Sequence, residues 1–358
     1  MAKSYSSFTI GRIFGIPIKL HITFLLVLPF FAYLFGTFCF EGSEHLWLWK
    51  LLLALGLFAG VTLHESAHSY VAMKNGIKIE SITLLPIGGV SQMEDIPEDP
   101  RIELRIAIAG PLMSILIGAL FLIAYVPFMK LEGDWIKFLL FMGAINLVLG
   151  IFNLLPAFPM DGGRILRTFL ARRMKYDVAT HYAVIVGHIF AIIMLFLGIL
   201  YFPGGIMLII IAMFLYIGGS EEERQTGILF ALKNLKVKDF MTREVDCLRE
   251  DLKIIEAMEE FLRTKHILYP VVGYNNRFAG ILTLSELSSV SKEEREALLI
   301  KDVIKQVDCL TPNDSSKTAV KKIGKSGINR LPVVENEKVV GIVSIGDIVR
   351  TAQIIKVK

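Results

Sequence analysis

Two histidines and a glutamate stand in the middle of an apolar stretch. Residues 51–70 read LLLALGLFAGVTLHESAHSY, so His64, Glu65 and His68 interrupt a run of mostly hydrocarbon side chains. On a helix, residues four apart lie on one face, one turn above the other. That spacing lets two imidazoles bind one zinc ion, with Glu65 beside them to move a proton. The residues therefore indicate a metal site for hydrolytic chemistry.

The surroundings of this pattern strengthen it. The five residues alone are a weak signal, because H-E-x-x-H also arises by chance in unrelated chains. Placing an ionisable group within a membrane span costs at least ~2.5 kcal/mol on insertion scales, so such groups rarely lack a role there. The alternative is a polar contact between helices, or a helix end lying in the headgroup region.

A catalytic zinc usually takes three protein ligands and keeps one position open. The candidate for the third ligand is Asp161, in residues 153–164, NLLPAFPMDGGR. The two prolines before Asp161 are expected to break or kink the helix, and the two glycines after it allow close approach of backbone. A broken helix would bring Asp161 back to the depth of the histidines. The alternative is a polar cap at a helix end.

The composition predicts a multi-pass membrane protein. Hydrophobic residues make up 54% of the 358 residues, and the mean hydropathy is +0.57. Apolar runs long enough to cross a bilayer, about 20 residues, lie near 22–40, 48–73, 106–129, 138–160 and 183–202. A shorter sixth run, 203–219, begins with Pro-Gly-Gly and is expected to form a tight hairpin with the fifth. We therefore expect about six transmembrane helices in residues 1–220, followed by a globular domain in residues 221–358.

Charge and cysteine content exclude other classes. The net charge of +4 is too small to indicate a nucleic-acid partner, and the three scattered cysteines argue against a disulfide framework or a thiolate metal site.

Lysine and arginine gather on one set of flanks, which by the charge rule places both termini and the globular domain in the cytoplasm. These flanks carry Lys3, Arg12, Lys19, Lys74, Lys78, Arg101, Arg105, Arg164, Arg167, Arg172, Arg173 and Lys175, against Lys50, Lys130 and Lys137 on the others.

The two motifs together resemble a known family. HESAH in one apolar segment and NLLPAFPMDGGR in a later one are similar to the motifs of the site-2 proteases, intramembrane zinc metalloproteases, in particular the prokaryotic members with C-terminal CBS repeats. The resemblance implies one zinc ion per chain on His64, His68 and Asp161, with Glu65 as the catalytic acid/base. It implies a second catalytic role for Asn153, which steadies the substrate or the oxyanion. The implied substrate is a membrane protein with a single transmembrane segment, cleaved within the lipid bilayer of the cell membrane.

Residues 79–93, IESITLLPIGGVSQM, have the pattern of a short strand, a turn and a returning strand. The family is similar in having a β-hairpin that enters the membrane at this place. An exposed strand edge here would bind an unwound substrate by β-addition. The alternative is an amphipathic connector at the headgroups.

The globular domain contains an internal repeat. KVKDFM at 236–241 matches LIKDVI at 299–304, VDCL at 245–248 recurs at 307–310, YPVV at 269–272 matches LPVV at 331–334, and GILTLSEL at 280–287 matches GIVSIGDI at 341–348. The pattern resembles a pair of α/β CBS motifs, repeat 1 at about 234–290 and repeat 2 at about 298–358. Such pairs often bind adenosine nucleotides, and the resemblance implies ligand contacts from Thr283 and Glu286 in repeat 1 and from Ser344 and Asp347 in repeat 2. The alternative is a structural platform that forms a homodimer.

Two other classes of function remain open from the residues alone. A transporter or channel also uses intramembrane ionisable groups, but would be expected to show paired broken helices, and only one broken segment is found. A scaffold that keeps a structural metal would not need Glu65. The sequence therefore favours an intramembrane zinc metalloprotease, modulated by a nucleotide at the CBS pair.

Overall fold

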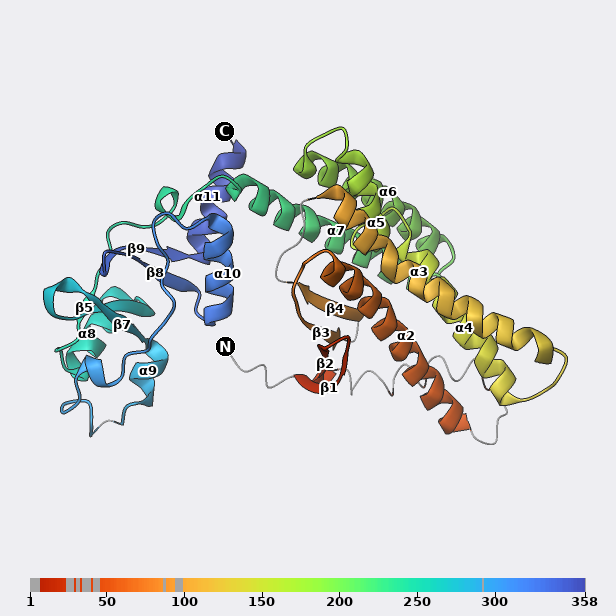
Figure 1. Cartoon of the computed structure of the whole chain (residues 1–358), viewed down its shortest axis with the longest axis horizontal. Coiled ribbons are helices and arrows are strands. Elements are labelled where there is room, and N and C mark those ends of the chain that lie inside the picture. The colour runs from red at the N-terminus through yellow and green to blue at the C-terminus, as the bar shows by residue number, and fades with distance from the viewer. Residues whose placement is uncertain are drawn as a thin grey trace. The chain divides into compact units, whose positions relative to one another are not determined.

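The structure, a computed structural model, describes residues 7–23, 29, 33, 40, 46–85, 88–93, 99–291 and 293–357. These residues form two compact units, one extending to Arg224 and one beginning at Gln225. In Figure 1 the first unit is coloured from red to green and the second from green to blue. The division falls within helix α7 (Ile206–Leu232).

The first unit is built mainly of long apolar helices. Within the described residues, four of them are long and apolar enough to cross a membrane. They are α2 (Leu46–Lys74), α3 (Pro100–Tyr125), α4 (Asp134–Asn153) and α6 (Tyr176–Leu200). α3 begins where Asp99 caps the backbone N–H of Arg101 and Pro100 takes the first helical position. Leucines at 112, 116 and 120 form an exposed stripe along α3, as expected of a face turned to lipid.

The expected count of six spans is not confirmed. The run at 22–40 lies mostly outside the described residues. The run at 203–219 forms the start of α7, where Glu221, Glu222 and Glu223 follow the apolar part, and α7 is not among the four candidate spans of the described residues. The expected tight hairpin is present, because the turn closes with the N–H of Gly205 donating to the carbonyl of Tyr201.

The first unit also contains a four-stranded sheet, of which strands β3 (Ile79–Leu85) and β4 (Gly88–Met93) contact α2. Its order is β1 (Ser7–Ile13), β2 (Ile16–His21), β3 and β4. The predicted hairpin at 79–93 is confirmed, and β4 is the outermost strand on its side. Strands β1 and β2 were not expected from the sequence. β2 pairs in parallel with β3, Ile18 opposite Ile82, and its alternate residues Ile16, Ile18 and Leu20 are buried.

The predicted break near the prolines is confirmed. α4 ends at Asn153, and the short helix α5 (Asp161–Leu170) begins after an irregular segment. The two glycines of α5 permit the tight fold: a Cβ at Gly163 would lie 2.6 Å from the backbone nitrogen of Phe158, and one at Gly162 would overlap the carbonyl of Leu155. The chain after α4 therefore turns back sharply, which places Asp161 at the first turn of α5.

The second unit has the repeated α/β structure expected from the sequence. Its first half contains β5 (Leu248–Arg249), α8 (Ile254–Thr264), β6 (Leu268–Val272), β7 (Phe278–Thr283) and α9 (Leu284–Ser289). Its second half contains α10 (Ser316–Ser326), β8 (Arg330–Glu335), β9 (Lys338–Ser344) and α11 (Ile345–Val357). Short 3-10 helices at Val237–Asp239 and Ile300–Asp302 precede the halves. Val237 lies in the buried core of the second half and Ile300 in that of the first, so each half completes the core of the other.

Candidate metal centre

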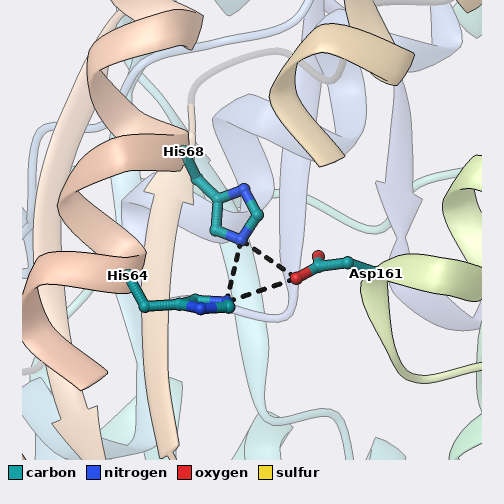
Figure 2. Close-up of side chains that lie close together, drawn as sticks. All are labelled: His64, His68 and Asp161. Atoms are coloured by element: carbon teal, nitrogen blue, oxygen red, sulfur yellow. Dashed lines mark hydrogen bonds and ion pairs between the residues drawn. The ribbon is translucent and has the colours of Figure 1, made fainter. Parts of the chain in front are cut away.

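Three side chains from two helices converge in the first unit. His64 and His68 project from α2, and Asp161 from the start of α5 (Figure 2). The Oδ2 atom of Asp161 lies 3.3 Å from Nε2 of His64 and 3.1 Å from Nε2 of His68, and the two Nε2 atoms are 3.1 Å apart. Both histidines are buried. The structure thus brings together the three residues expected to bind metal, although more than 90 residues separate Asp161 from the histidines.

Helix α3 fixes the orientation of both imidazoles. The backbone carbonyl of Ile106 accepts a hydrogen bond from Nδ1 of His68 at 2.6 Å, and the hydroxyl of Ser114 lies 2.9 Å from Nδ1 of His64. A carbonyl only accepts, so Nδ1 of His68 carries the proton and Nε2 of the neutral ring has a free lone pair. Partners of this kind orient metal-bound histidines and fix their tautomer.

The chemistry of these residues fits a zinc ion. With the proton of each neutral imidazole on Nδ1, Nε2 of each histidine and a carboxylate oxygen are three acceptors that point at one another, an arrangement that a cation between them stabilises. Zinc bonds of about 2.0–2.1 Å place tetrahedral ligand atoms about 3.3 Å apart, close to the separations found here.

Space for the ion is also present, at Gly110 of α3. A Cβ at this position would lie 2.6 Å from Nε2 of His64 and closer still to Nε2 of His68. The missing side chain therefore leaves open the region that both nitrogens face.

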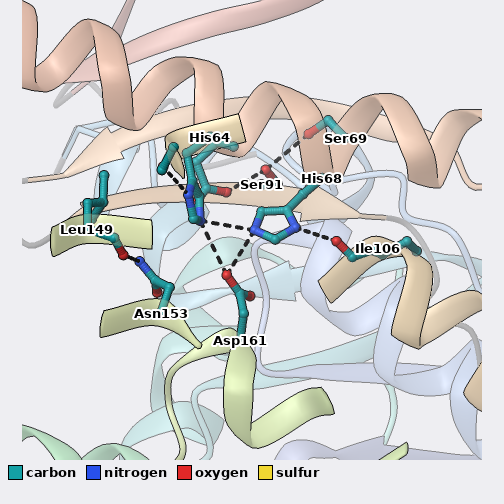
Figure 3. A network of polar contacts seen from close by, with 10 residues as sticks. His64, His68, Ser69, Ser91, Ile106, Leu149, Asn153 and Asp161 are labelled. Atoms are coloured by element: carbon teal, nitrogen blue, oxygen red, sulfur yellow. Dashed lines mark hydrogen bonds and ion pairs between the residues drawn. The ribbon is translucent and has the colours of Figure 1, made fainter. Parts of the chain in front are cut away.

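Glu65 and Asn153 lie outside this cluster. The carboxylate of Glu65, partly buried, accepts a hydrogen bond of 2.9 Å from the hydroxyl of Ser91 on β4. Asn153 ends α4, and its amide donates to the carbonyl of Leu149 in the preceding turn (Figure 3). The structure therefore connects Glu65 to the hairpin and leaves the amide of Asn153 in a local helical bond.

A buried ionic cluster holds α5 against α3. The guanidinium of Arg167 pairs with Glu103 of α3 and donates to Glu222 of α7 at 2.8 Å, and the hydroxyl of Tyr176 donates to Glu103 at 3.1 Å. Both Arg167 and Glu103 are buried. Burial alone would lower the pKa of Arg167, but the carboxylate of Glu103 raises it above its ordinary value, so the guanidinium is charged. Since Arg167 and Asp161 share α5, this cluster also fixes the helix that carries Asp161.

The candidate ligand residues of the second unit form two equivalent pairs. In repeat 2, the hydroxyl of Ser344 donates to the carboxylate of Asp347 at 2.6 Å, and both line a cavity of about 690 Å³. The same cavity is lined by Arg330 and Arg350, and the Nε atom of Arg330 is buried without a hydrogen-bond partner.

In repeat 1, Thr283 donates to Glu286 in the same way. This pair is not part of the lining of that cavity.

The contribution of α3 was not expected from the sequence. Ile106, Gly110 and Ser114 are spaced by four and therefore share one face of this helix. Small residues at a spacing of four in an apolar span are typical of close helix packing, and this signal was present at Gly110 and Ser114. Ser91 and the buried pair of Arg167 and Glu103 were also not expected. For the pair, the sequence held a signal: a glutamate and an arginine each stand beside an apolar span, where charged side chains are buried only when they are paired.

The chain is similar to known protein families and to characterised members of them. The model of peptidase family M50 matches residues 52–131 and 128–197, and that of the CBS domain matches 237–293 and 300–353. The chain is 38% identical to zinc metalloprotease MJ0392 of Methanocaldococcus jannaschii, over 98% of both chains. It is also similar to the solved site-2 protease from the same organism, with 44% identity and a TM-score of 0.46, covering 61% of this chain and 95% of that one.

Proposed function

Because this chain belongs to the M50 family of site-2 zinc metalloproteases with a C-terminal CBS pair, we propose that it hydrolyses peptide bonds within the transmembrane segment of single-span membrane proteins. The convergence of His64, His68 and Asp161 between apolar helices carries this proposal. In it, these three residues bind the zinc ion and Glu65 is the catalytic acid/base.

The residues of the chain have distinct parts in this reaction. A bound zinc ion supplies a Lewis acid for the attack of water on the peptide carbonyl. Glu65 takes a proton from the attacking water and returns it to the departing amine. Asn153 donates its amide to the developing oxyanion, which requires it to exchange its present bond to Leu149 for one to the substrate.

The first experiment compares the wild-type protein with Glu65→Gln. Both are purified in detergent, their zinc content is measured, and cleavage of a transmembrane peptide is followed. We expect Glu65→Gln to keep its zinc and to lose cleavage, because an amide cannot take up the proton. Equal cleavage by both proteins would contradict the role of Glu65. Asn153→Ala is expected to lower kcat by about 10²–10³, the usual effect of losing one oxyanion donor.

The second part of the proposal concerns regulation through the CBS pair. An adenosine nucleotide would bind in the cavity that Ser344 and Asp347 line together with residues of both repeats. Asp347 and Ser344 would face the ribose and the phosphates, with Arg330 and Arg350 as counter-charges. Thr283 and Glu286 would form the equivalent contacts in repeat 1. Titration calorimetry with ATP, ADP and AMP tests this on the full chain. Asp347→Ala is expected to abolish binding in repeat 2, and unchanged binding in that variant would refute the assignment. If the wild-type protein binds none of the three nucleotides and forms a homodimer, the CBS pair is a structural platform instead.

The proposed topology has both termini and the CBS pair in the cytoplasm. It follows from the uneven distribution of lysine and arginine between the two sets of flanks. Labelling of single cysteines at Lys130 and at Lys175 by an impermeant maleimide in intact cells tests it. We expect the cysteine at position 130 to react and the one at position 175 to be protected; the reverse result would invert the topology.

A further inference from the structure

The hydroxyl of Ser91 is placed to hold the carboxylate of Glu65. Ser91 lies on β4 and donates to Oε2 of Glu65 at 2.9 Å, across 26 residues of sequence. A glutamate side chain has three rotatable bonds, so its carboxylate has no fixed direction unless a partner supplies one. Among the described contacts, Ser91 is a partner of this carboxylate that comes from outside α2.

Ser91 is itself held from a second side. Its Oγ lies 3.1 Å from Oγ of Ser69, a fully buried residue one helical turn beyond Glu65 (Figure 3). A serine hydroxyl has one hydrogen to donate. If that hydrogen goes to Glu65, Ser69 must donate to Ser91, so the three side chains form a directed chain that ends at the carboxylate.

The backbone of β4 also lies directly against Glu65. A Cβ at Gly89 would overlap Cγ of Glu65 and would lie 3.2 Å from its Cδ. Gly89 and Ser91 are two residues apart on a strand and therefore face the same side. The strand thus contacts the glutamate at two positions: Gly89 leaves space for its side chain, and Ser91 donates a hydrogen bond to its carboxylate.

The same strand has a free edge. In the described sheet β4 is outermost and pairs with β3 alone, so its other edge has backbone groups available to an added strand. On the proposed function, an unwound substrate would pair at this edge. The strand that receives the substrate is then the strand that holds the acid/base.

We propose that Ser91 is a positioning residue for Glu65, so that the β3–β4 hairpin sets the direction of the acid/base as well as offering the edge for substrate. This inference rests on the proposed role of Glu65. It assigns to Ser91 an effect on the reaction itself and not on zinc binding, because Ser91 contacts neither histidine nor Asp161 in the described network.

The test compares Ser91→Ala with Ser91→Thr in the full-length protein. Ser91→Ala is expected to lower kcat by between about tenfold and about a hundredfold, the range for a lost hydrogen bond to a charged group, with KM and zinc content unchanged. Ser91→Thr keeps the hydroxyl and is expected to restore most of kcat. The matched control is Ser66→Ala, since the buried hydroxyl of Ser66 donates to Thr62 within α2; its kcat is expected to stay within about twofold of wild type.

A second measurement does not depend on activity. In a chain whose three native cysteines are replaced by serine, Ser69→Cys with Ser91→Cys is expected to form a disulfide under mild oxidation, because the two Oγ atoms are 3.1 Å apart. Tyr70→Cys with Ser91→Cys is the control pair, since Tyr70 is exposed and points away from Ser69 along the helix circumference. Absence of the first disulfide, or equal yields from both pairs, would overturn the proposed contact.

The outcomes separate this inference from the function on which it rests. If Glu65→Gln is inactive while Ser91→Ala keeps full kcat, the positioning role is wrong and the acid/base assignment survives. A rise in KM at constant kcat in Ser91→Ala would equally overturn it, because the hairpin would then only bind substrate. If Glu65→Gln still cleaves, the proposed acid/base itself fails, whatever the Ser91 variants do.

Discussion

Replacing Gly110 with alanine is expected to remove zinc from the protein. Gly110 lies on the face of α3 that also carries Ile106 and Ser114, the partners of the two histidines. A methyl group there would stand 2.6 Å from Nε2 of His64, against 3.4 Å or more for an ordinary contact. It would also occupy the region toward which both nitrogens point.

The size of the effect follows from these distances. Relieving the contact with His64 alone requires the imidazole to move by about 0.8 Å, whereas zinc–ligand bonds tolerate about 0.2 Å. At least one ligand is therefore lost. We expect zinc affinity to fall by more than about a hundredfold, beyond the 10–100-fold loss typical of removing an outer partner of a metal ligand. The purified variant should hold less than about a tenth of one zinc ion per chain and should not cleave peptide.

The assay measures zinc per chain by mass spectrometry after equilibration with zinc and removal of the excess, together with thermal unfolding in detergent. The matched control is Gly56→Ala, whose added methyl group would meet the flexible end of the Met142 side chain, 2.6 Å from its sulfur. Because that side chain can move, the control should keep its zinc. A Gly110→Ala protein that holds one zinc ion per chain would refute the placement of the metal between α2, α3 and α5.

Three other substitutions or modifications are informative. Arg167→Met leaves the buried carboxylate of Glu103 without its counter-charge, with the hydroxyl of Tyr176 as its remaining described partner. It is expected to lower the free energy of unfolding by about 3–5 kcal/mol. Adding Glu103→Gln should recover most of this loss in a double-mutant cycle, and strict additivity would contradict the pairing. Burial raises the pKa of Cys309 from 9.0 to about 11. At pH 8 its thiolate fraction should therefore be about a hundredfold below that of an ordinary thiol, and the rate of its alkylation should rise as the pH approaches 11. A plateau of that rate near pH 9 would contradict this prediction. Gly162→Ala would drive a methyl group into the carbonyl of Leu155 and should displace α5, detected as loss of zinc and of thermal stability; a variant with normal zinc content would show that the turn before α5 can open without cost.

The metal site could be predicted from sequence because its chemistry is restrictive. Two histidines four apart require a helix, and an aspartate between prolines and glycines marks a broken helix, so few alternatives satisfy both. The structure brings His64, His68 and Asp161 within bonding reach of one ion. The family match also sets aside the transporter and scaffold alternatives, which the residues alone left open.

The supporting helix could not be predicted in the same way. In a soluble helix, the buried face is recognised because it is more apolar than the exposed face. Lipid and protein interior are both apolar, so the two faces of α3 differ little in hydropathy, and the face toward the histidines carries the small residues Gly110 and Ser114 beside Ile106. The partners of the histidines include a backbone carbonyl, at Ile106, which has no sequence signature at all.

The N-terminal strands were missed for a different reason. The alternation of Ile16, Ile18 and Leu20 is present in the sequence, but β2 has only six residues, and so short an alternating run is a weak strand signal by itself. Its pairing partner, β3, lies beyond α2 in the chain. A parallel strand pair joined through a long helix leaves no local signal of its register.

The parallel pairing of β2 with β3 has a consequence for biogenesis. β2 is synthesised before α2, yet its partner strand emerges only after that helix is complete. During translation, Ile16, Ile18 and Leu20 can pair with β1 at once, but they must wait for β3 until the helix with the histidines has been made. The pairing of β2 with β3 is thus a late assembly step, completed only after the helix that carries His64 and His68 has been synthesised.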